Sequence, residues 1–172
     1  MVQRGMVETR ARARAIVLAG EVLIDGQPAK SAGTPVRSDQ VISLKEKARF
    51  VSRGGEKLDH ALEQFQIDIT GRVCADFGAS TGGFTDCLLS RGAVRVYAID
   101  VGYGQLHQRL REDDRVIVME RVNVRLLENL PEQIDLVSID VSFISLALVL
   151  PVAMKVLRDG GACIPLIKPQ FE

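Results

Sequence analysis

A glycine-rich loop between a predicted strand and a predicted helix is the part of the sequence best suited to hold a ligand. Residues 73–75 form an apolar run typical of a short buried strand, and a helical pattern starts at Phe84. Backbone N–H groups in such a loop face a ligand lying across the strand end, and glycine allows close approach because it has no Cβ. The predicted contacts here are Asp76, Gly78, Ala79, Ser80, Thr81, Gly82, Gly83 and Phe84.

A second acidic residue indicates what kind of ligand this is. Asp100 ends the strand predicted over residues 94–99 and follows Asp76 by 24 positions. In nucleoside-binding α/β folds an acidic side chain meets the ribose hydroxyls after ~20 residues. The loop has neither the Gly-Lys-Ser/Thr of a P-loop nor Gly-x-Gly-x-x-Gly. We therefore expect a nucleoside with little or no phosphate, contacted also by Val101. Asn123 either contacts its adenine edge or caps the following helix.

The pattern from residue 72 onward alternates between strands and helices. Strands are predicted near 73–76, 94–99, 116–119, 134–139 and 162–167. Such alternation is typical of a parallel sheet covered on both faces, which binds ligands beyond the carboxyl ends of its strands. Asp76, Asp100 and Asp140 each close a strand, so we expect their carboxylates on one rim. A helix is predicted over Leu146–Leu157, with Pro151 either kinking it or marking its true start.

The first part of the chain has a different character. Up to Lys57 it holds 11 Lys and Arg against 6 Asp and Glu, although the whole chain has no net charge. A helix is predicted over Thr9–Ala19, with Thr9 as its N-cap, and carries Arg10, Arg12 and Arg14. The arginines are either a solvated helix face or a surface that grips phosphates. A strand at 22–24, a turn at Asp25-Gly26 and a returning strand at 40–44 complete a small α+β unit.

Composition excludes several functional classes. The chain of 172 residues is 47% hydrophobic and 26% charged, which is ordinary for a globular protein. No apolar run approaches the ~18 residues of a membrane span, and no leader pattern opens the chain, so we expect no membrane partner and a cytoplasmic location. Cys74, Cys87 and Cys163 are widely spaced and predicted to be reduced thiols. His60 and His107 lack ligand partners, so no metal is expected.

Four motifs in the second part of the chain are GASTGGFTDC at 78–87, DVGYGQL at 100–106, DVSFISL at 140–146 and KPQFE at 168–172. Together they resemble the TlyA, or hemolysin A, family of FtsJ-like, S-adenosylmethionine-dependent rRNA 2′-O-methyltransferases. The resemblance implies a Rossmann-like α/β sheet that binds S-adenosylmethionine. It also implies methylation of cytidine in ribosomal RNA, with ribosomal subunits as partners. Residues 12–26 resemble the small RNA-binding module of a ribosomal protein and of pseudouridine synthases.

The same resemblance implies residue roles and boundaries. Lys57, in SRGGEKL, aligns with the first catalytic lysine of the family, and Asp140 and Lys168 align with two further members of its Lys-Asp-Lys-Glu tetrad. Arg53 is expected to join the module's arginines in binding RNA. The family's closing glutamate lies beyond the position of Glu172, so the chain is expected to be truncated at both ends. The predicted parts are a module at 1–48, a linker at 49–57 and a methyltransferase domain at 58–172.

Two other functions are compatible with such a sheet. A non-catalytic RNA-binding or ribosome-assembly factor would keep the cofactor fold and would need no closing glutamate. A nucleotide-dependent oxidoreductase would bind a dinucleotide, against which the glycine pattern argues. Binding of S-adenosylmethionine together with methyl transfer to RNA would distinguish the methyltransferase from the assembly factor and from the oxidoreductase.

Overall fold

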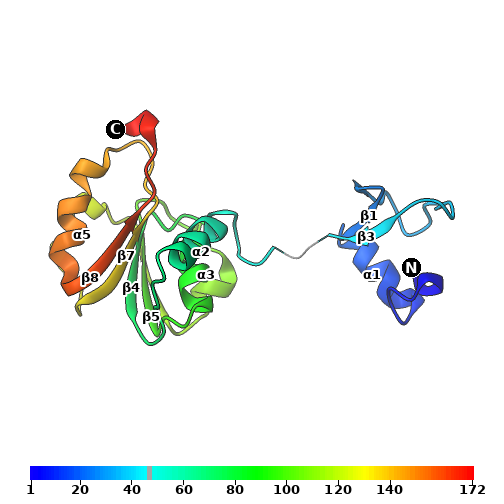
Figure 1. Cartoon of the computed structure of the whole chain (residues 1–172), viewed down its shortest axis with the longest axis horizontal. Helices are drawn as coiled ribbons and strands as arrows, with labels where there is room; N and C mark the ends of the chain where they lie inside the picture. Colours follow the sequence, from blue (N-terminus) through cyan, green and yellow to red (C-terminus); the bar gives the residue numbers. More distant parts are fainter. Residues whose placement is uncertain (46–47) are drawn as a thin grey trace. The chain divides into compact units, whose positions relative to one another are not determined.

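The computed structural model describes residues 1–45 and 48–172, and the chain divides into two compact units, Met1–Lys47 and Ala48–Glu172 (Figure 1). Residues 46 and 47, near the end of the module predicted over 1–48, lie outside the described residues.

The first unit combines one α-helix with a small antiparallel sheet of order β2-β1-β3. Its elements are η1 (Val2–Arg4), α1 (Arg10–Leu18), β1 (Val22–Ile24), β2 (Gln27–Pro28) and β3 (Ile42–Leu44). The predicted N-cap is confirmed, because the Thr9 hydroxyl accepts a hydrogen bond from the Arg12 amide at 3.1 Å.

The turn at Asp25-Gly26 is confirmed, but the strand it leads to was predicted wrongly. Both residues have positive φ, 50° and 78°, as a tight two-residue hairpin turn requires. The turn joins β1 to the short β2, where Ile24 pairs with Gln27. The strand predicted at 40–44 is β3, which pairs with the other edge of β1. Two residues of β2 are too few for the sequence pattern to reveal a strand.

The second unit is built on a five-stranded parallel sheet of order β6-β5-β4-β7-β8. Its strands are β4 (Val73–Phe77), β5 (Arg95–Asp100), β6 (Val116–Glu120), β7 (Ile134–Ile139) and β8 (Leu157–Pro165). All five predicted strands are present, and the parallel arrangement is confirmed. β8 starts five residues before the predicted position, and its pairing with β7 is irregular between Ile134 and Leu136.

Helices cover the sheet on both faces, as Figure 1 shows. On one face, Leu58 and Leu62 of α2 (Gly54–Gln64) and Leu88 of α3 (Gly83–Ser90) are fully buried. On the other face lies α5 (Leu150–Val156), with Ala153 and Val156 buried. The remaining helical elements are α4 (Gln108–Arg111), η2 (Val124–Leu126), η3 (Leu146–Leu148) and η4 (Pro169–Phe171). The central strands are apolar on both sides because both faces are covered.

The segment predicted as a linker at 49–57 is part of the second unit. Phe50 is only 3% exposed, and the Val51 amide donates to Asp86 at 2.8 Å. The ring of Phe50 fills the space beside Gly55, where a Cβ would lie 2.4 Å from the ring. Helix α2 starts at Gly54, four residues earlier than the domain predicted to start at 58. The charged neighbours of Phe50 concealed its burial in the sequence pattern.

Pro151 marks a helix start rather than a kink. The region predicted as one helix over Leu146–Leu157 is divided into η3 and α5, and the proline lies in the first turn of α5. Proline is tolerated there because that amide would have no helical acceptor. The last predicted residue, Leu157, already belongs to β8.

The cysteines are free thiols, as predicted. Cys74 and Cys87 are buried, and burial raises the pKa of each thiol to about 12, so neither ionises readily. His60 is exposed on α2, and the ring of His107 accepts a hydrogen bond from the Arg109 amide at the start of α4.

An ion-pair cluster fastens α2 to α3 and to the segment before α2. Asp59, 8% exposed, accepts from Arg91 Nε at 2.6 Å and also pairs with Arg49. Burial opposes the ionisation of Asp59, but the hydrogen bonds and charges of the two arginines outweigh it and lower the pKa of this carboxyl.

Replacing Asp59 with asparagine should therefore lower the free energy of unfolding by about 2 kcal/mol at neutral pH. Because the folded-state pKa of Asp59 is lowered, its contribution is present above the unfolded pKa. It disappears as the pH falls through the folded pKa. Urea titrations at several pH values should show the gap between wild type and Asp59→Asn closing under acid conditions. Gln64→Ala, at an exposed position of α2, is the control. A gap independent of pH would contradict this role.

Candidate functional site

The glycine loop passes directly against the carboxyl end of β7. Gly78 has a φ of 87°, and a Cβ at this position would lie 2.8 Å from the Asp140 carbonyl oxygen. Glycine is needed here for both reasons, since other residues rarely adopt this φ. At Gly83 a Cβ would lie 2.2 Å from Ser52 Oγ and 2.9 Å from the Gly55 amide nitrogen, so the start of α2 leaves little room for a side chain. The loop is thus packed between β7 and the start of α2, with a cavity on either side of the Gly78–Asp140 contact.

The first cavity, of about 490 Å³, lies beyond the end of β5. Asp100 lines it and fixes the glycine loop, since its carboxylate accepts from the amides of Ser80 at 2.8 Å and Gly102 at 2.7 Å. Each carboxylate oxygen takes one of these bonds, and a carboxylate offers about four lone-pair sites. Asp100 can therefore order the loop and still accept from a ligand.

Two other predicted cofactor residues line the same cavity. Val101 is 67% exposed beside Asp100. Asn123 caps η2, because its side-chain oxygen accepts from the Arg125 amide at 3.1 Å. Of the two interpretations of Asn123, capping is confirmed. Its position in the cavity wall leaves a ligand contact compatible with capping.

Asp76 does not stand on the rim, contrary to the prediction. It lies inside β4 with no exposed surface, and it contacts neither cavity. Its carboxylate accepts from the Thr85 amide at 2.9 Å and from the hydroxyls of Thr85 at 2.7 Å and Ser138 at 3.3 Å. Burial raises the pKa of Asp76 to about 7, and these hydrogen bonds oppose that shift. Asp76 thus fastens α3 to the sheet.

Gly82 also faces the interior rather than a ligand. A Cβ at this position would lie 2.2 Å from the side chain of Leu110, and the residue lines neither cavity. The other loop residues predicted to contact the cofactor do line the cavities, and they are Gly78, Ala79, Ser80, Thr81, Gly83 and Phe84.

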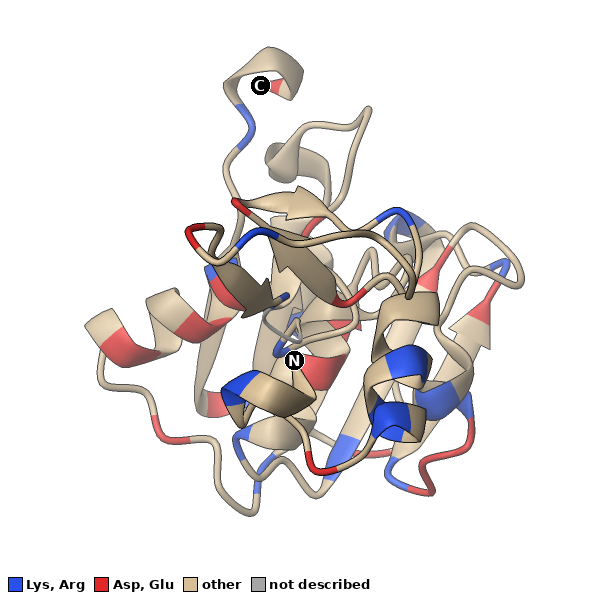
Figure 2. Cartoon of the chain, turned by 90° about the vertical axis from the view of Figure 1, so that its right-hand side faces the viewer, with Lys and Arg blue, Asp and Glu red and all other residues tan. Residues whose placement is uncertain are grey.

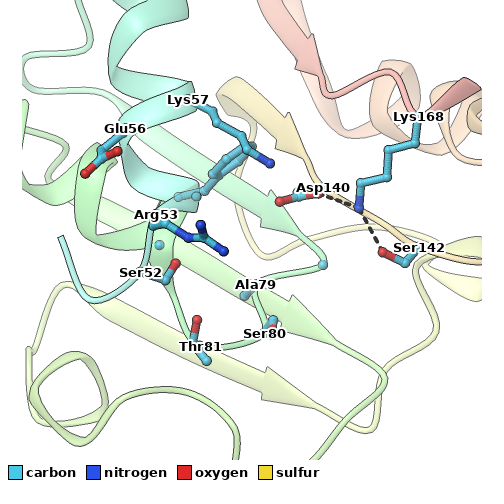
Figure 3. A pocket seen from close by; sticks show the side chains of 14 residues that line it. Ser52, Arg53, Glu56, Lys57, Ala79, Ser80, Thr81, Asp140, Ser142 and Lys168 are labelled. Carbon is cyan, nitrogen blue, oxygen red and sulfur yellow. Dashed lines mark hydrogen bonds and ion pairs between the residues drawn. The ribbon is translucent and has the colours of Figure 1, made fainter.

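The second cavity, of about 810 Å³, brings together the three residues that resemble a catalytic set. Lys168 Nζ lies 2.6 Å from Asp140 Oδ1 and donates to Ser142 Oγ at 2.8 Å. Figure 3 shows Lys57 extending from α2 toward Asp140, on the side opposite Lys168. Lys57 and Lys168 therefore line the same cavity as the glycine loop.

The electrostatics of this cavity favour an oxygen that gains negative charge. Arg53, predicted to bind RNA, lines the cavity with Lys57 and Lys168, close to the N-terminus of α2. Glu56 also lines the cavity, and Figure 3 shows its side chain directed away from the three cations. Asp140 balances only part of this charge, and it does so through Lys168. Positive charges gathered in this way stabilise a nearby alkoxide or carboxylate.

Sequence reasoning missed three polar residues of this cavity, Ser52, Glu56 and Ser142. Ser52 precedes Arg53 and packs against Gly83, and Ser142 holds Lys168. Serine is common in loops, and the sequence positions of Ser52 and Ser142 indicated neither a ligand nor a lysine partner. The position of Ser142 two residues after Asp140 in DVSFISL was the one signal that could have indicated it.

The predicted RNA-binding arginines of the first unit lie exposed on α1, and Figure 2 marks them in blue with the other basic residues. They are Arg10, Arg12 and Arg14. Exposure is compatible with a solvated face and with a phosphate-binding surface. Within residues 1–45 and 48–172, no three His, Cys, Asp or Glu side chains gather as a metal site would require. No helix in the described part of the chain is long and apolar enough to cross a membrane.

Each of the two units matches a known protein family. Residues 50–172 match the FtsJ-like methyltransferase family, and residues 1–42 match the S4 domain. A relative from Mycobacterium tuberculosis, named 16S/23S rRNA (cytidine-2′-O)-methyltransferase TlyA, is 49% identical over all of this chain and 66% of its own length. Hemolysin A of Brachyspira hyodysenteriae is 42% identical over 98% of this chain and 71% of its own length.

A solved structure from Streptococcus thermophilus has 46% sequence identity and a TM-score of 0.73, and it covers 99% of this chain and 64% of that one. The chain thus spans about two thirds of the length of these relatives. The resemblance found in the four motifs is confirmed. This chain belongs to the TlyA, or hemolysin A, group of the FtsJ-like methyltransferases, with an S4 domain in its first part.

Proposed function

We propose that this protein transfers a methyl group from S-adenosylmethionine to the ribose 2′-hydroxyl of cytidine in ribosomal RNA. The observation that supports this most strongly is the convergence of Lys57, Asp140 and Lys168 in one cavity beside the glycine loop. The name of the Mycobacterium relative supports cytidine and ribosomal RNA as the target.

The residues present fit the proposed cofactor. The cavity at Asp100 has the size and the acidic wall that a nucleoside needs, and apolar side chains such as Val101 and Val124 line it. Asp100 would hold the ribose hydroxyls, and Val101 and Asn123 would contact the adenine. Backbone groups of the loop from Gly78 to Thr81 would hold the amino-acid portion. When bound, S-adenosylmethionine supplies a methyl group already activated by a sulfonium.

The chain's own task is then to orient the acceptor hydroxyl and to manage its proton. A ribose hydroxyl is a weak acid, so an ammonium beside it stabilises the developing alkoxide. Lys168 is fixed by Asp140 and Ser142 and cannot turn away without losing both contacts. Lys57 faces the same space from α2 and supplies a second positive charge. Asp140 orients Lys168 and offsets part of the charge of the two lysines.

We assign the first unit the task of holding the RNA. Its match to the S4 domain and its exposed arginines support contact with RNA phosphates, which carry most of the affinity and make it dependent on salt. Arg53, in the catalytic cavity, would contact the RNA near the reacting ribose or would contact the cofactor carboxylate. The proposed setting is the cytoplasm, where ribosomal RNA is modified.

Replacing Asp100 with alanine should weaken S-adenosylmethionine binding by at least about tenfold. The change removes the proposed ribose acceptor and releases the Ser80 and Gly102 amides. Isothermal titration calorimetry would measure the dissociation constant. Asp114→Ala, at an exposed position, should bind as wild type does. Equal affinity of Asp100→Ala and wild type would refute the assigned role.

Lys168→Ala should reduce methyl transfer to ribosomal RNA by at least about a hundredfold and leave cofactor affinity within about twofold of wild type. Incorporation of radioactive methyl groups would measure transfer, and calorimetry would measure binding. Lys155→Ala, exposed on α5, is the matched control. Wild type that binds the cofactor and RNA without transfer would support the alternative of a non-catalytic RNA-binding factor.

Changing Arg10 and Arg14 together to alanine should weaken RNA binding and make it less sensitive to salt. Each lost phosphate contact lowers the slope of log affinity against log salt by about 0.7 to 0.9. Filter binding of ribosomal RNA over a range of salt concentrations would measure both effects. Arg37→Ala is the control, because Arg37 is exposed in the same unit but pairs with Asp39. An unchanged slope would identify the arginines as a solvated face.

A further inference from the structure

We propose that residues 168–172 form a positioning strap for Lys168, anchored at its two ends by Ser142 and Glu172. The proposal rests on the proposed function, because it assigns Lys168 its place beside the acceptor hydroxyl. Ser142 and Glu172 are positioning residues that act through Lys168. The strap and the loop at 140–146 follow β8 and β7, which are neighbours at the edge of the sheet.

The near anchor acts on the lysine itself. Lys168 has two acceptors, Asp140 at 2.6 Å and Ser142 at 2.8 Å, and both belong to the loop after β7. A lysine side chain loses rotamer entropy when it is fixed. One acceptor leaves the ammonium free to rotate about that contact, whereas two acceptors define its direction. Ser142 therefore decides where the remaining N–H groups of Lys168 point.

The far anchor fixes the backbone that carries the lysine. The carboxylate of Glu172 accepts from the Leu146 amide at 3.0 Å and from the Ser145 hydroxyl at 2.9 Å. Ser145 and Leu146 stand at the start of η3. Both ends of the strap therefore bind the loop at 140–146. Between the anchors, the rings of Phe143 and Phe171 lie 5.2 Å apart. The two segments are thus joined at both ends and in the middle.

The backbone of the loop shows why such an anchor is needed. Phe143 has a φ of 62°, which is unfavourable for a bulky residue, and it is 90% exposed. Burial of its ring therefore contributes little to hold this conformation. The hydrogen bonds on either side, from Lys168 to Ser142 and from Leu146 to Glu172, hold the strained turn in place. Loss of either anchor should let the turn relax and move Asp140 and Lys168 apart.

The first experiment measures the placement of Lys168 without reference to activity. The folded chain is acetylated briefly with a limiting amount of N-hydroxysuccinimidyl acetate, and mass spectrometry gives the ratio of modification at Lys168 to that at Lys57. Ser142→Ala and Glu172→Ala should each raise this ratio about fivefold, because the ammonium is less firmly held. Ser142→Thr and Glu172→Gln keep a hydrogen-bonding oxygen and should restore the wild-type ratio. Gln170→Ala, exposed within the strap, is the matched control.

The second experiment measures methyl transfer by the same variants. Ser142→Ala and Glu172→Ala should lower kcat about tenfold, leave the KM for S-adenosylmethionine within about twofold, and recover with the threonine and glutamine variants. An unchanged acetylation ratio would overturn the strap, whether or not wild type transfers methyl groups. A raised ratio with wild-type kcat would overturn its positioning role. Wild type without transfer would refute the proposed function, while the ratio would still decide the strap.

Discussion

The passage of the glycine loop against the end of β7 is the constraint on which the whole site depends. The loop can lie there only because Gly78 has no Cβ to meet the Asp140 carbonyl. This contact separates two cavities that share Gly78, Ser80, Asp140 and Ser142 in their walls. A ligand whose ends occupy both cavities would have its middle beside Asp140. The geometry thus suits a donor with a nucleoside at one end and a reacting centre near the other.

The three acidic residues illustrate how one strand-end pattern serves three physical roles. Asp76 is buried and fastens α3 to the sheet, Asp100 orders the glycine loop at a cavity wall, and Asp140 pairs with Lys168. Their sequence contexts are similar, since each follows an apolar run. Their environments differ because β4 continues through Phe77, whereas Asp100 ends its strand and Asp140 follows its own. A difference of one or two residues in where the strand ends thus separates a buried carboxylate from carboxylates that line a cavity.

The wall that carries Lys57 is held in place by charges away from the cavity. Asp59 pairs with Arg91 and Arg49. Asp86 accepts a hydrogen bond from the Val51 amide and pairs with the Arg109 guanidinium. Both carboxylates are largely buried at the junction of α2 and α3. They connect the segment at 49–57 to the helix that follows the glycine loop. The distance between the lysine and the loop is therefore fixed by ion pairs and by glycine contacts together.

The sequence by itself determined the parallel sheet and the strand-end positions of Asp100 and Asp140, and its resemblance to the family pointed to Lys57 and Lys168. Hydrophobic runs, glycines and strand-end acidic residues are local signals, so short stretches of sequence are enough to recognise them. Only the tertiary structure decided that Asp76 is buried, that residues 49–57 belong to the second unit, and that Ser142 and Glu172 fasten the strap. These outcomes depend on contacts between residues far apart in the chain, such as Val51 with Asp86 and Ser145 with Glu172. The hydrophobic periodicity of the sequence does not reveal such contacts, because they form only when distant elements pack together.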